Sequence, residues 1–209
     1  MSLSVDTKNV FYNEHPYVDL DLPSGTLWST MNVGAFKPSD FGFYFQWGDT
    51  SGYTADQIGT ENGKKKFASD WSDYKFGKPN FSKYKIKGVK LELEDDAAHV
   101  HMGGNWHMPT PEQIKELLNK TTTARTTSDG AIGVKFTSKE DTSKFIFIPA
   151  AGHADNGSVY NAGSNGAIWS SMLSTGRADY GQYLDLHTDS VHLFDNFRHY
   201  GFRVRGVLG

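Results

Sequence analysis

Short runs near the C-terminus, in which apolar and polar residues alternate, constrain the fold of this chain most strongly. They are Gly181–His187, Val191–Asp195 and Gly201–Val207, and a more apolar run, Ala167–Leu173, precedes them. A period of two is typical of a β-strand with one buried face. The sequence therefore predicts that the C-terminal part of the chain forms a set of short strands.

The two faces of these strands differ in chemistry. The apolar positions, which we expect in the core, are Leu184, Leu186, Val191, Leu193, Phe202 and Val204. The alternate positions, which we expect to face outward, are Tyr183, Asp185, His187, His192, Phe194, Arg203 and Arg205. Aromatic, acidic and imidazole groups are an unusual choice for a face that meets only solvent.

A change in composition accompanies these runs. The last of the 16 lysines is Lys144 and the last of the seven glutamates is Glu140. Soluble surfaces normally use both residues freely, because both are well solvated. Tyrosine, histidine and asparagine are typical of adaptable binding surfaces. We interpret the outward positions as a binding face; the alternative is a small sheet whose outer face happens to lack long charged side chains.

Composition excludes several classes of function. The 209 residues suffice for one larger domain or two small ones, and the formal charge of −3 does not favour a nucleic-acid partner. With no cysteine, the chain has no disulfide, thiolate metal site or cysteine nucleophile. No stretch is long and apolar enough for membrane insertion, and the N-terminus as given does not resemble a signal peptide.

The order of predicted elements indicates a single α+β domain over residues 17–209, after an N-terminal tail at 1–16. A Pro-Ser-Gly turn joins strands at 17–22 and 26–34, and residues 49–88 form an irregular insertion that packs through its own aromatic side chains. Helices are predicted at 92–102 and 110–120, strands at 121–127, 132–136 and 145–149, a loop at 152–166, and a C-terminal binding segment at 167–207.

Several motifs resemble one known family. They include Leu22-Pro-Ser-Gly-Thr-Leu-Trp, Glu94-Asp-Asp-Ala-Ala-His, Gly103-Gly-Asn-Trp-His-Met-Pro-Thr, Phe147-Ile-Pro-Ala-Ala-Gly, Trp169-Ser-Ser and Gly201-Phe-Arg-Val-Arg. In this order they resemble the Fibrobacter succinogenes major paralogous domain, common in gut Bacteroidetes. The resemblance implies a C-type-lectin-like fold of the formylglycine-generating-enzyme type, in which Trp28, Trp47, Trp106 and Trp169 are core anchors.

The same resemblance implies a more specific hypothesis. Some members of the family are variable proteins of diversity-generating retroelements, in which mutagenesis of template adenines yields a restricted residue set that lacks Lys, Glu and Trp. Residues 174–200 of this chain contain no Lys, Glu, Met or Trp, and Gln182 alone falls outside the expected set. The resemblance thus implies that this segment is diversified for binding.

Two histidine groups invite a metal-site interpretation. His99, His101 and His107 lie close in sequence, but a spacing of two points the first pair in different directions on a helix, so packing is the favoured explanation. His187, His192 and His199 lie near Asp185 and Asp195 in the sequence. Such a set could bind a divalent cation or take part in acid–base catalysis. Because no candidate nucleophile accompanies them, we favour ligand contact and predict no catalytic residue, metal or cofactor.

The activities known for this type of fold are not predicted here. Calcium-dependent sugar binding in C-type lectins uses a Glu-Pro-Asn or Gln-Pro-Asp tripeptide, which this chain lacks. Formylglycine generation requires cysteine chemistry, which the composition excludes.

We therefore predict a binding protein whose partner is a protein or glycan on a cell surface. The predicted contact residues are Asp179, Tyr180, Gln182, Tyr183, Asp185, His187, His192, Phe194, Asp195, Phe197, His199 and Tyr200. The expected setting is extracellular, on a bacterial cell surface or a phage virion, and a homo-oligomer or larger carrier would raise avidity. The alternatives are a carbohydrate-binding module of gut Bacteroidetes and a hydrolase or transferase on the same scaffold.

Overall fold

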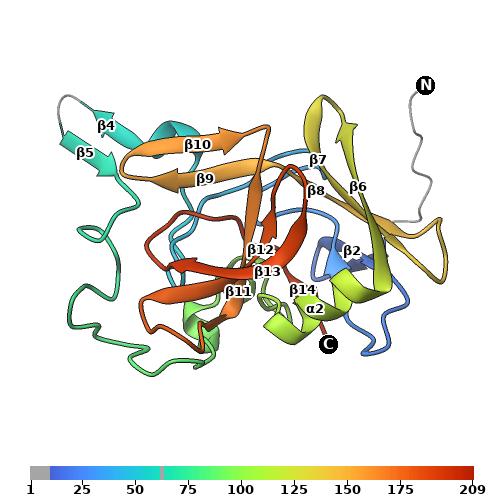
Figure 1. Cartoon of the computed structure of the whole chain (residues 1–209), viewed down its shortest axis with the longest axis horizontal. Coiled ribbons are helices and arrows are strands. Elements are labelled where there is room, and N and C mark those ends of the chain that lie inside the picture. Colours follow the sequence, from blue (N-terminus) through green and yellow to red (C-terminus); the bar gives the residue numbers. More distant parts are fainter. Residues whose placement is uncertain (1–9, 62–63) are drawn as a thin grey trace.

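The computed structural model describes residues 10–61 and 64–209, which form the predicted α+β fold with two α-helices and mostly antiparallel strands (Figure 1). Of the tail predicted at 1–16, residues 1–9 lie outside the described part. The remainder already belongs to a four-stranded sheet in the order β1 (Val10–Tyr12), β2 (His15–Asp19), β3 (Leu27–Ser29) and β14 (Val207–Leu208). The two ends of the described chain therefore share one sheet.

The helices begin where side chains can cap them. α2 (Pro111–Lys120) has the predicted capping box, because the Thr110 side chain accepts from the Gln113 N–H at 3.2 Å and Gln113 accepts from the Thr110 N–H at 2.9 Å. The helix predicted at 92–102 is instead a short 3₁₀ turn (Leu93–Asp95) followed by α1 (Ala97–Met102). The break falls at Asp96, whose carboxylate accepts from the His99 N–H at 3.0 Å and so starts a new helix.

A three-stranded sheet follows α2. Strands β6 (Thr121–Ser128) and β7 (Ala131–Ser138) are joined by Asp129-Gly130, and β7 pairs with β8 (Phe145–Pro149). Positive φ angles of 44° and 83° at Asp129 and Gly130 match the turn that an Asp-Gly pair predicts.

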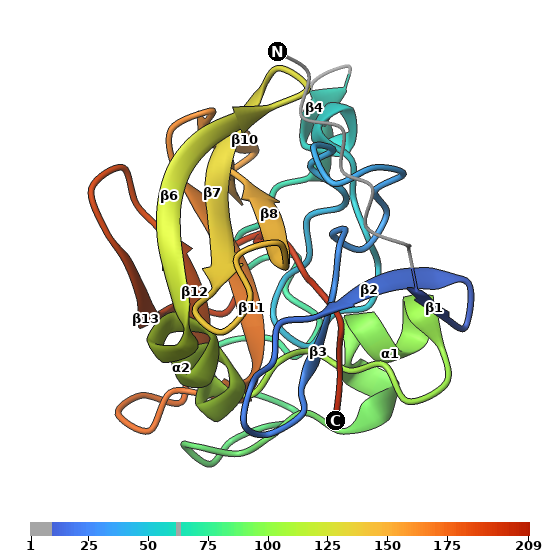
Figure 2. The same cartoon turned by 90° about the vertical axis from the view of Figure 1, so that its right-hand side faces the viewer.

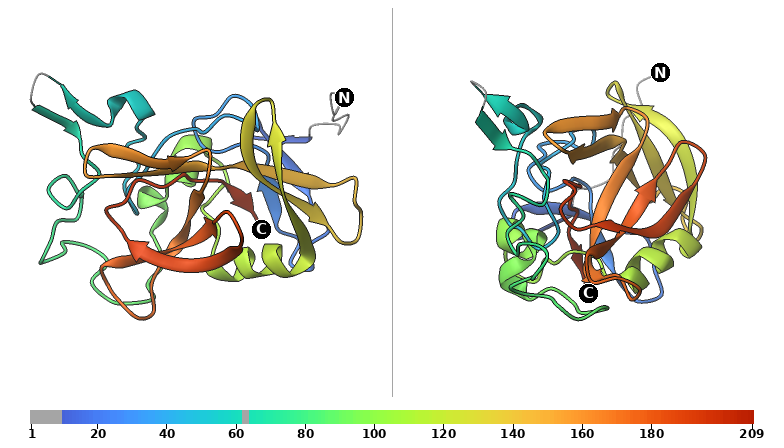
Figure 3. Two further views of the ribbon diagram at one scale, coloured as in Figure 1. Left: turned by 45° about the horizontal axis from the view of Figure 1, so that its top comes forward. Right: turned by 60° about the vertical axis from the view of Figure 1, so that its left-hand side comes forward.

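The largest sheet contains the first three of the four C-terminal runs. Its order is β10 (Ser158–Ala162), β9 (Ala151–Asp155), β11 (Gly166–Leu173), β12 (Tyr180–Leu186) and β13 (Val191–Phe197). The prediction of a loop at 152–166 is wrong, because these residues form the β9–β10 hairpin. In the pairing order β11 lies between this hairpin and the β12–β13 ribbon (Figures 1 and 3).

The insertion at 49–88 carries little regular structure. It contains a 3₁₀ turn (Ala55–Gln57) and the short pair β4 (Gly59–Glu61) and β5 (Lys64–Phe67). As predicted, it packs through aromatic side chains: Tyr74, Phe76 and Tyr84 are all buried, in the same hydrophobic cluster as Trp47. This packing holds a long segment in place whose own sheet is limited to the β4–β5 pair.

Two hydrophobic clusters make up the core. One surrounds Trp47, Trp106 and Trp169, and the other surrounds Trp28 together with the apolar side chains of α2, β7, β8 and β12. All four tryptophans are fully buried, which confirms the prediction that they are core anchors. Figure 2 shows α1 and α2 on opposite sides of the molecule. None of the described helices has the length and apolar character needed to cross a membrane.

The outward orientation predicted for Arg203 and Arg205 is wrong, because both side chains are buried. The run 201–207 is not a regular strand but an extended segment that bridges to Phe45, Ala154 and Ile168 in turn. Both of its alternating sets of side chains are buried, so alternation does not place its polar residues in solvent. Arg205 Nε donates to Asn32 Oδ1 at 3.0 Å and Nη1 donates to the Phe147 carbonyl at 3.0 Å.

Candidate ligand-binding surface

The pairing of β12 with β13 decides which predicted contact residues share a face. In the antiparallel register, Tyr183 lies opposite Phe194 and Asp185 lies opposite His192. Since paired residues point to the same side of a sheet, these four side chains share a face, and His187 continues it by alternation. The structure thus brings five of the predicted residues together, on the side opposite Leu184 and Leu186.

Exposure differs among these five residues. Phe194 is 55% exposed and His187 is also exposed, whereas Asp185 and His192 are half-buried. Tyr183 is only 6% exposed, which corrects the prediction that it faces outward. Its ring packs at 4.7 Å from Phe202 and 6.0 Å from Trp169, so it belongs to the core and forms the floor of the face.

A hollow of about 210 Å³ lies between the β9–β10 hairpin and the β12–β13 face. Its polar lining consists of His153, Asn161, Asn165, Tyr183, Asp185, His187, Asn196 and Tyr200. Four of these eight, namely His153, Asn161, Asn165 and Asn196, are absent from the residues predicted from the sequence. The first three come from the segment predicted to be a loop, and the Asn156-Gly157 pair is the signal that would have identified its hairpin.

Asp185 is the acidic group of this hollow. Its Oδ2 lies 3.4 Å from His192 Nε2, and its side chain is 19% exposed. Burial raises the pKa of the Asp185 carboxyl, and the nearby imidazoles, His192 first, act in the opposite direction. The carboxylate is therefore partly removed from water, with the His192 imidazole as its ion-pair partner.

His153 forms part of an aromatic row on the opposite wall. Its ring stacks on Tyr160 at 5.6 Å and on Tyr200 at 5.5 Å, with interplanar angles of 28° and 25°. Burial lowers the pKa of the His153 imidazole, so the row is uncharged at neutral pH. The hollow therefore combines flat aromatic walls with one carboxylate and several amides.

His199 does not belong to the exposed face. It is 5% exposed, its Nδ1 lies 3.0 Å from the Ser69 carbonyl oxygen, and its ring lies 4.4 Å from the Trp71 ring. The prediction of a ligand contact here is wrong, because the residue anchors the insertion to the end of β13.

The other predicted residues, Asp179, Tyr180, Gln182, Asp195 and Phe197, lie around the start of β12 and the end of β13, outside the lining of the hollow. Most of their polar groups have partners within the chain. Asp179 pairs with Arg177 at 2.8 Å, Gln182 donates to the Leu173 carbonyl at 3.0 Å, and Ser174 donates to Asp195. The predicted surface therefore divides into the hollow and a separate, internally satisfied group.

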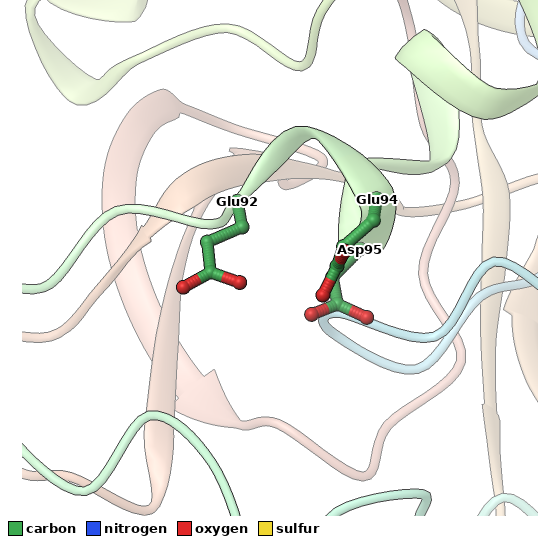
Figure 4. A group of neighbouring side chains, drawn as sticks. All are labelled: Glu92, Glu94 and Asp95. Atoms are coloured by element: carbon green, nitrogen blue, oxygen red, sulfur yellow. The ribbon is translucent and has the colours of Figure 1, made fainter.

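A cluster of three carboxylates outside the hollow has the spacing of a metal site. Carboxylate oxygens of Glu92, Glu94 and Asp95 lie within 4.8 Å of one another (Figure 4). The Lys83 ammonium, however, lies among them, 2.8 Å from Glu94 and 2.5 Å from Asp95, and Lys75 lies 2.6 Å from Asp95. Lysine side chains thus supply the positive charge that this cluster needs.

The histidines at 99, 101 and 107 contact the backbone carbonyl oxygens of different segments. Nδ1 of His99 contacts the Trp106 carbonyl at 3.2 Å, Nε2 of His101 contacts the Thr50 carbonyl at 2.8 Å, and Nε2 of His107 contacts the Gly209 carbonyl at 3.1 Å. These contacts support the packing interpretation over a shared metal.

Comparison with known proteins gives no independent assignment. No protein-family profile, no characterised protein and no solved structure matches this chain. The family resemblance and the C-type-lectin-like fold stay predictions from the sequence motifs, and the identified class is the coarser one, an α+β fold.

Proposed function

We propose that this protein binds a macromolecular target through the β12–β13 face and the adjoining hollow. The observation that carries the proposal is the grouping of Phe194, His187 and Asp185 on one face beside a concave surface. An exposed aromatic ring next to half-buried polar groups is typical of the centre of a binding surface. The absence of Lys and Glu after residue 144 supports the same conclusion.

The finer proposal is that the protein is the variable protein of a diversity-generating retroelement, displayed on a C-type-lectin-like scaffold outside the cell or on a phage particle. It is supported by the order of family motifs and by the restricted composition of residues 174–200. The coding sequence of this segment should then have a near-copy, altered at adenines, beside a reverse transcriptase gene. A genome that contains neither would contradict retroelement diversification but would leave the binding surface as proposed.

Binding is favoured over catalysis because the most prominent exposed group on the face is a phenylalanine, which contributes contact area but no acid–base or nucleophilic chemistry. The Asp185–His192 pair resembles an acid–base dyad, but it lies beside an open hollow and not within an enclosed pocket. We therefore propose recognition as the primary function and no enzymatic activity.

The test is a binding screen of the full chain against arrays of glycans and of cell-surface proteins. The Phe194→Ala variant should weaken the strongest interaction by about tenfold or more, since central aromatic contacts contribute 1–3 kcal/mol or more. The matched control is Phe36→Ala, which removes the same ring from a position that is 94% exposed and outside the hollow. Equal binding by the two variants, or no binding by the wild type, would refute the proposal.

A further inference from the structure

The charges around the hollow are unbalanced. Asp185 is the one carboxylate among its lining residues, and within the described part of the chain neither lysine nor arginine contributes to that lining. The remaining titratable groups are tyrosines and the imidazoles of His153 and His187. The charge of Asp185 is therefore not balanced by a lysine or arginine in the lining, and burial lowers the pKa of the His153 imidazole.

The Asp185 carboxylate has unused capacity to accept hydrogen bonds. A carboxylate offers about four acceptor positions. Within the described residues, its polar partner is His192 Nε2, at 3.4 Å from Oδ2, a distance longer than that of a strong charged hydrogen bond. The carboxylate therefore presents an oxygen to the hollow in surroundings that raise the cost of leaving it unpaired.

The rest of the lining suits a planar cation. Half-buried Tyr200 supplies an aromatic ring to the lining, and the neighbouring rings of Tyr183 and Phe202 are almost fully buried. An aromatic ring attracts a positive charge when water is excluded. Asn161 and Asn165 bring amide groups, whose carbonyl oxygens accept hydrogen bonds. A guanidinium carries five N–H donors in one plane and stacks on aromatic rings, so it can use both kinds of group at once.

The size of the hollow limits the occupant. Sites for drug-sized ligands measure roughly 300–1,000 Å³, and this hollow has about 210 Å³. One side chain is thus enough to fill it. We infer that the hollow binds an arginine side chain of the protein target, with Asp185 as the counter-ion and the aromatic rings as its walls.

This inference depends on the proposed recognition function, and it selects a protein target over a glycan. A neutral saccharide would also use the amides and the carboxylate through its hydroxyl groups. The two occupants differ in charge, so a probe that loses its charge without changing shape distinguishes them. Citrulline is such a probe, because its urea group replaces the guanidinium in the same plane.

The experiment is an NMR titration of the full ¹⁵N-labelled chain at pH 7.5 with Nα-acetyl-arginine methylamide, its citrulline analogue, and a set of methyl glycosides. We expect the arginine probe to shift the resonances of Asp185, His187 and Asn165 saturably. The citrulline probe should bind about tenfold more weakly or not at all, because a charged hydrogen bond contributes roughly 1.5–3 kcal/mol. Asp185→Asn should cause a similar loss.

The control variant is Asp129→Asn, which makes the same change of charge in the β6–β7 turn, where asparagine also tolerates the φ of 44°. It should bind the arginine probe like the wild type. Equal binding of arginine and citrulline, saturable binding of a glycoside instead, or no binding of the arginine probe would overturn the inference. If Phe194→Ala weakens target binding and Asp185→Asn does not, the recognition function stands and the arginine assignment fails.

Discussion

Arg205 illustrates at the level of a single residue why alternation misplaced the arginines. Its side chain is fully buried, and burial lowers the pKa of its guanidinium to about 9, so it is still charged at neutral pH. Instead of a carboxylate, it contacts Asn32 Oδ1 and the carbonyl oxygens of Ser29 and Phe147. Because these acceptors come from distant parts of the chain, one side chain connects β3, the loop after it and β8.

Replacing this residue should therefore be costly. We expect Arg205→Met to lower the free energy of unfolding by about 3 kcal/mol, because it leaves three buried acceptors without a donor. The measurement is urea denaturation. Arg125→Met is the control, since Arg125 is exposed and its loss should cost less than about 1 kcal/mol. A similar cost for both variants would show that the buried contacts add little.

A second prediction concerns His153 and the dependence of the free energy of unfolding on pH. Burial lowers the pKa of its imidazole in the folded protein, although the charges of Asp155 and Asp185 raise it in part. The unfolded chain therefore binds a proton more readily below about pH 6.5. The contribution of His153 to stability is present above that pH and is lost as the pH falls, at up to about 1.4 kcal/mol per pH unit.

We expect the free energy of unfolding to decrease between pH 7.5 and pH 5.5, and the decrease to be smaller in His153→Phe. Phenylalanine preserves the ring between Tyr160 and Tyr200 but cannot be protonated. Guanidinium denaturation of both proteins at several pH values provides the comparison. If the free energies of unfolding of the two proteins change with pH in parallel, His153 does not cause the pH dependence.

At the level of elements, the β9–β10 hairpin is the part that makes a flat strand pair into a concave site. Its turn has φ angles of 46° at Asn156 and 73° at Gly157, and the Gly157 N–H donates to the Ala68 carbonyl at 2.6 Å. The turn thereby connects the hairpin to the insertion. A residue other than glycine in this left-handed conformation costs roughly 1–2 kcal/mol.

Gly157→Ala should thus lower the free energy of unfolding by about 1 kcal/mol and shift the NMR resonances of Asn161 and Asn165. Gly176→Ala is the matched control: an added Cβ there meets only Ser174 Oγ at 3.5 Å, and its φ is not in the left-handed region. The control should cost less and leave the hollow unchanged. If the resonances of Asn161 and Asn165 do not shift in Gly157→Ala, the turn of the hairpin does not determine the shape of the site.

The sequence predicted the elements whose pattern is local. The Thr110 capping box, the Asp129-Gly130 turn and the alternation of β12 each identified an element that the structure confirms. It did not predict the β9–β10 hairpin, because glycine, asparagine and serine dominate the segment and conceal the Asn156-Gly157 turn.

The burial of Tyr183, His199 and Arg205 was also not predictable, since it depends on segments from elsewhere in the chain. Tyr183 packs on Phe202, and His199 packs on Trp71 of the insertion. Alternation along one strand reports which side chains share a face, but it does not report what covers that face. The sequence therefore predicted residues of the wall that β12 and β13 form, and it missed the wall that the β9–β10 hairpin forms.

For the whole molecule, the same strands supply both the core and the binding face. Leu184 and Leu186 are fully buried on one side of β12, and His187 and Phe194 are exposed on the other side of the β12–β13 pair. Such a scaffold can change its contacts without losing its fold only if the exposed positions contribute little to stability. Diversification of residues 174–200 would accordingly have to spare buried members such as Tyr183 and Arg198.

This separation can be measured directly. We expect the triple variant His187→Asn, His192→Asn, Phe194→Asn to change the free energy of unfolding by less than about 1 kcal/mol, because His187 and Phe194 are exposed, His192 is half-buried, and substitutions at such surface positions have small effects. Leu184→Ala alone should cost about 3 kcal/mol, because it leaves a cavity in the core. Both are compared with the wild type by urea denaturation. A triple variant as unstable as Leu184→Ala would mean that these side chains support the fold, and that the face is not free to vary.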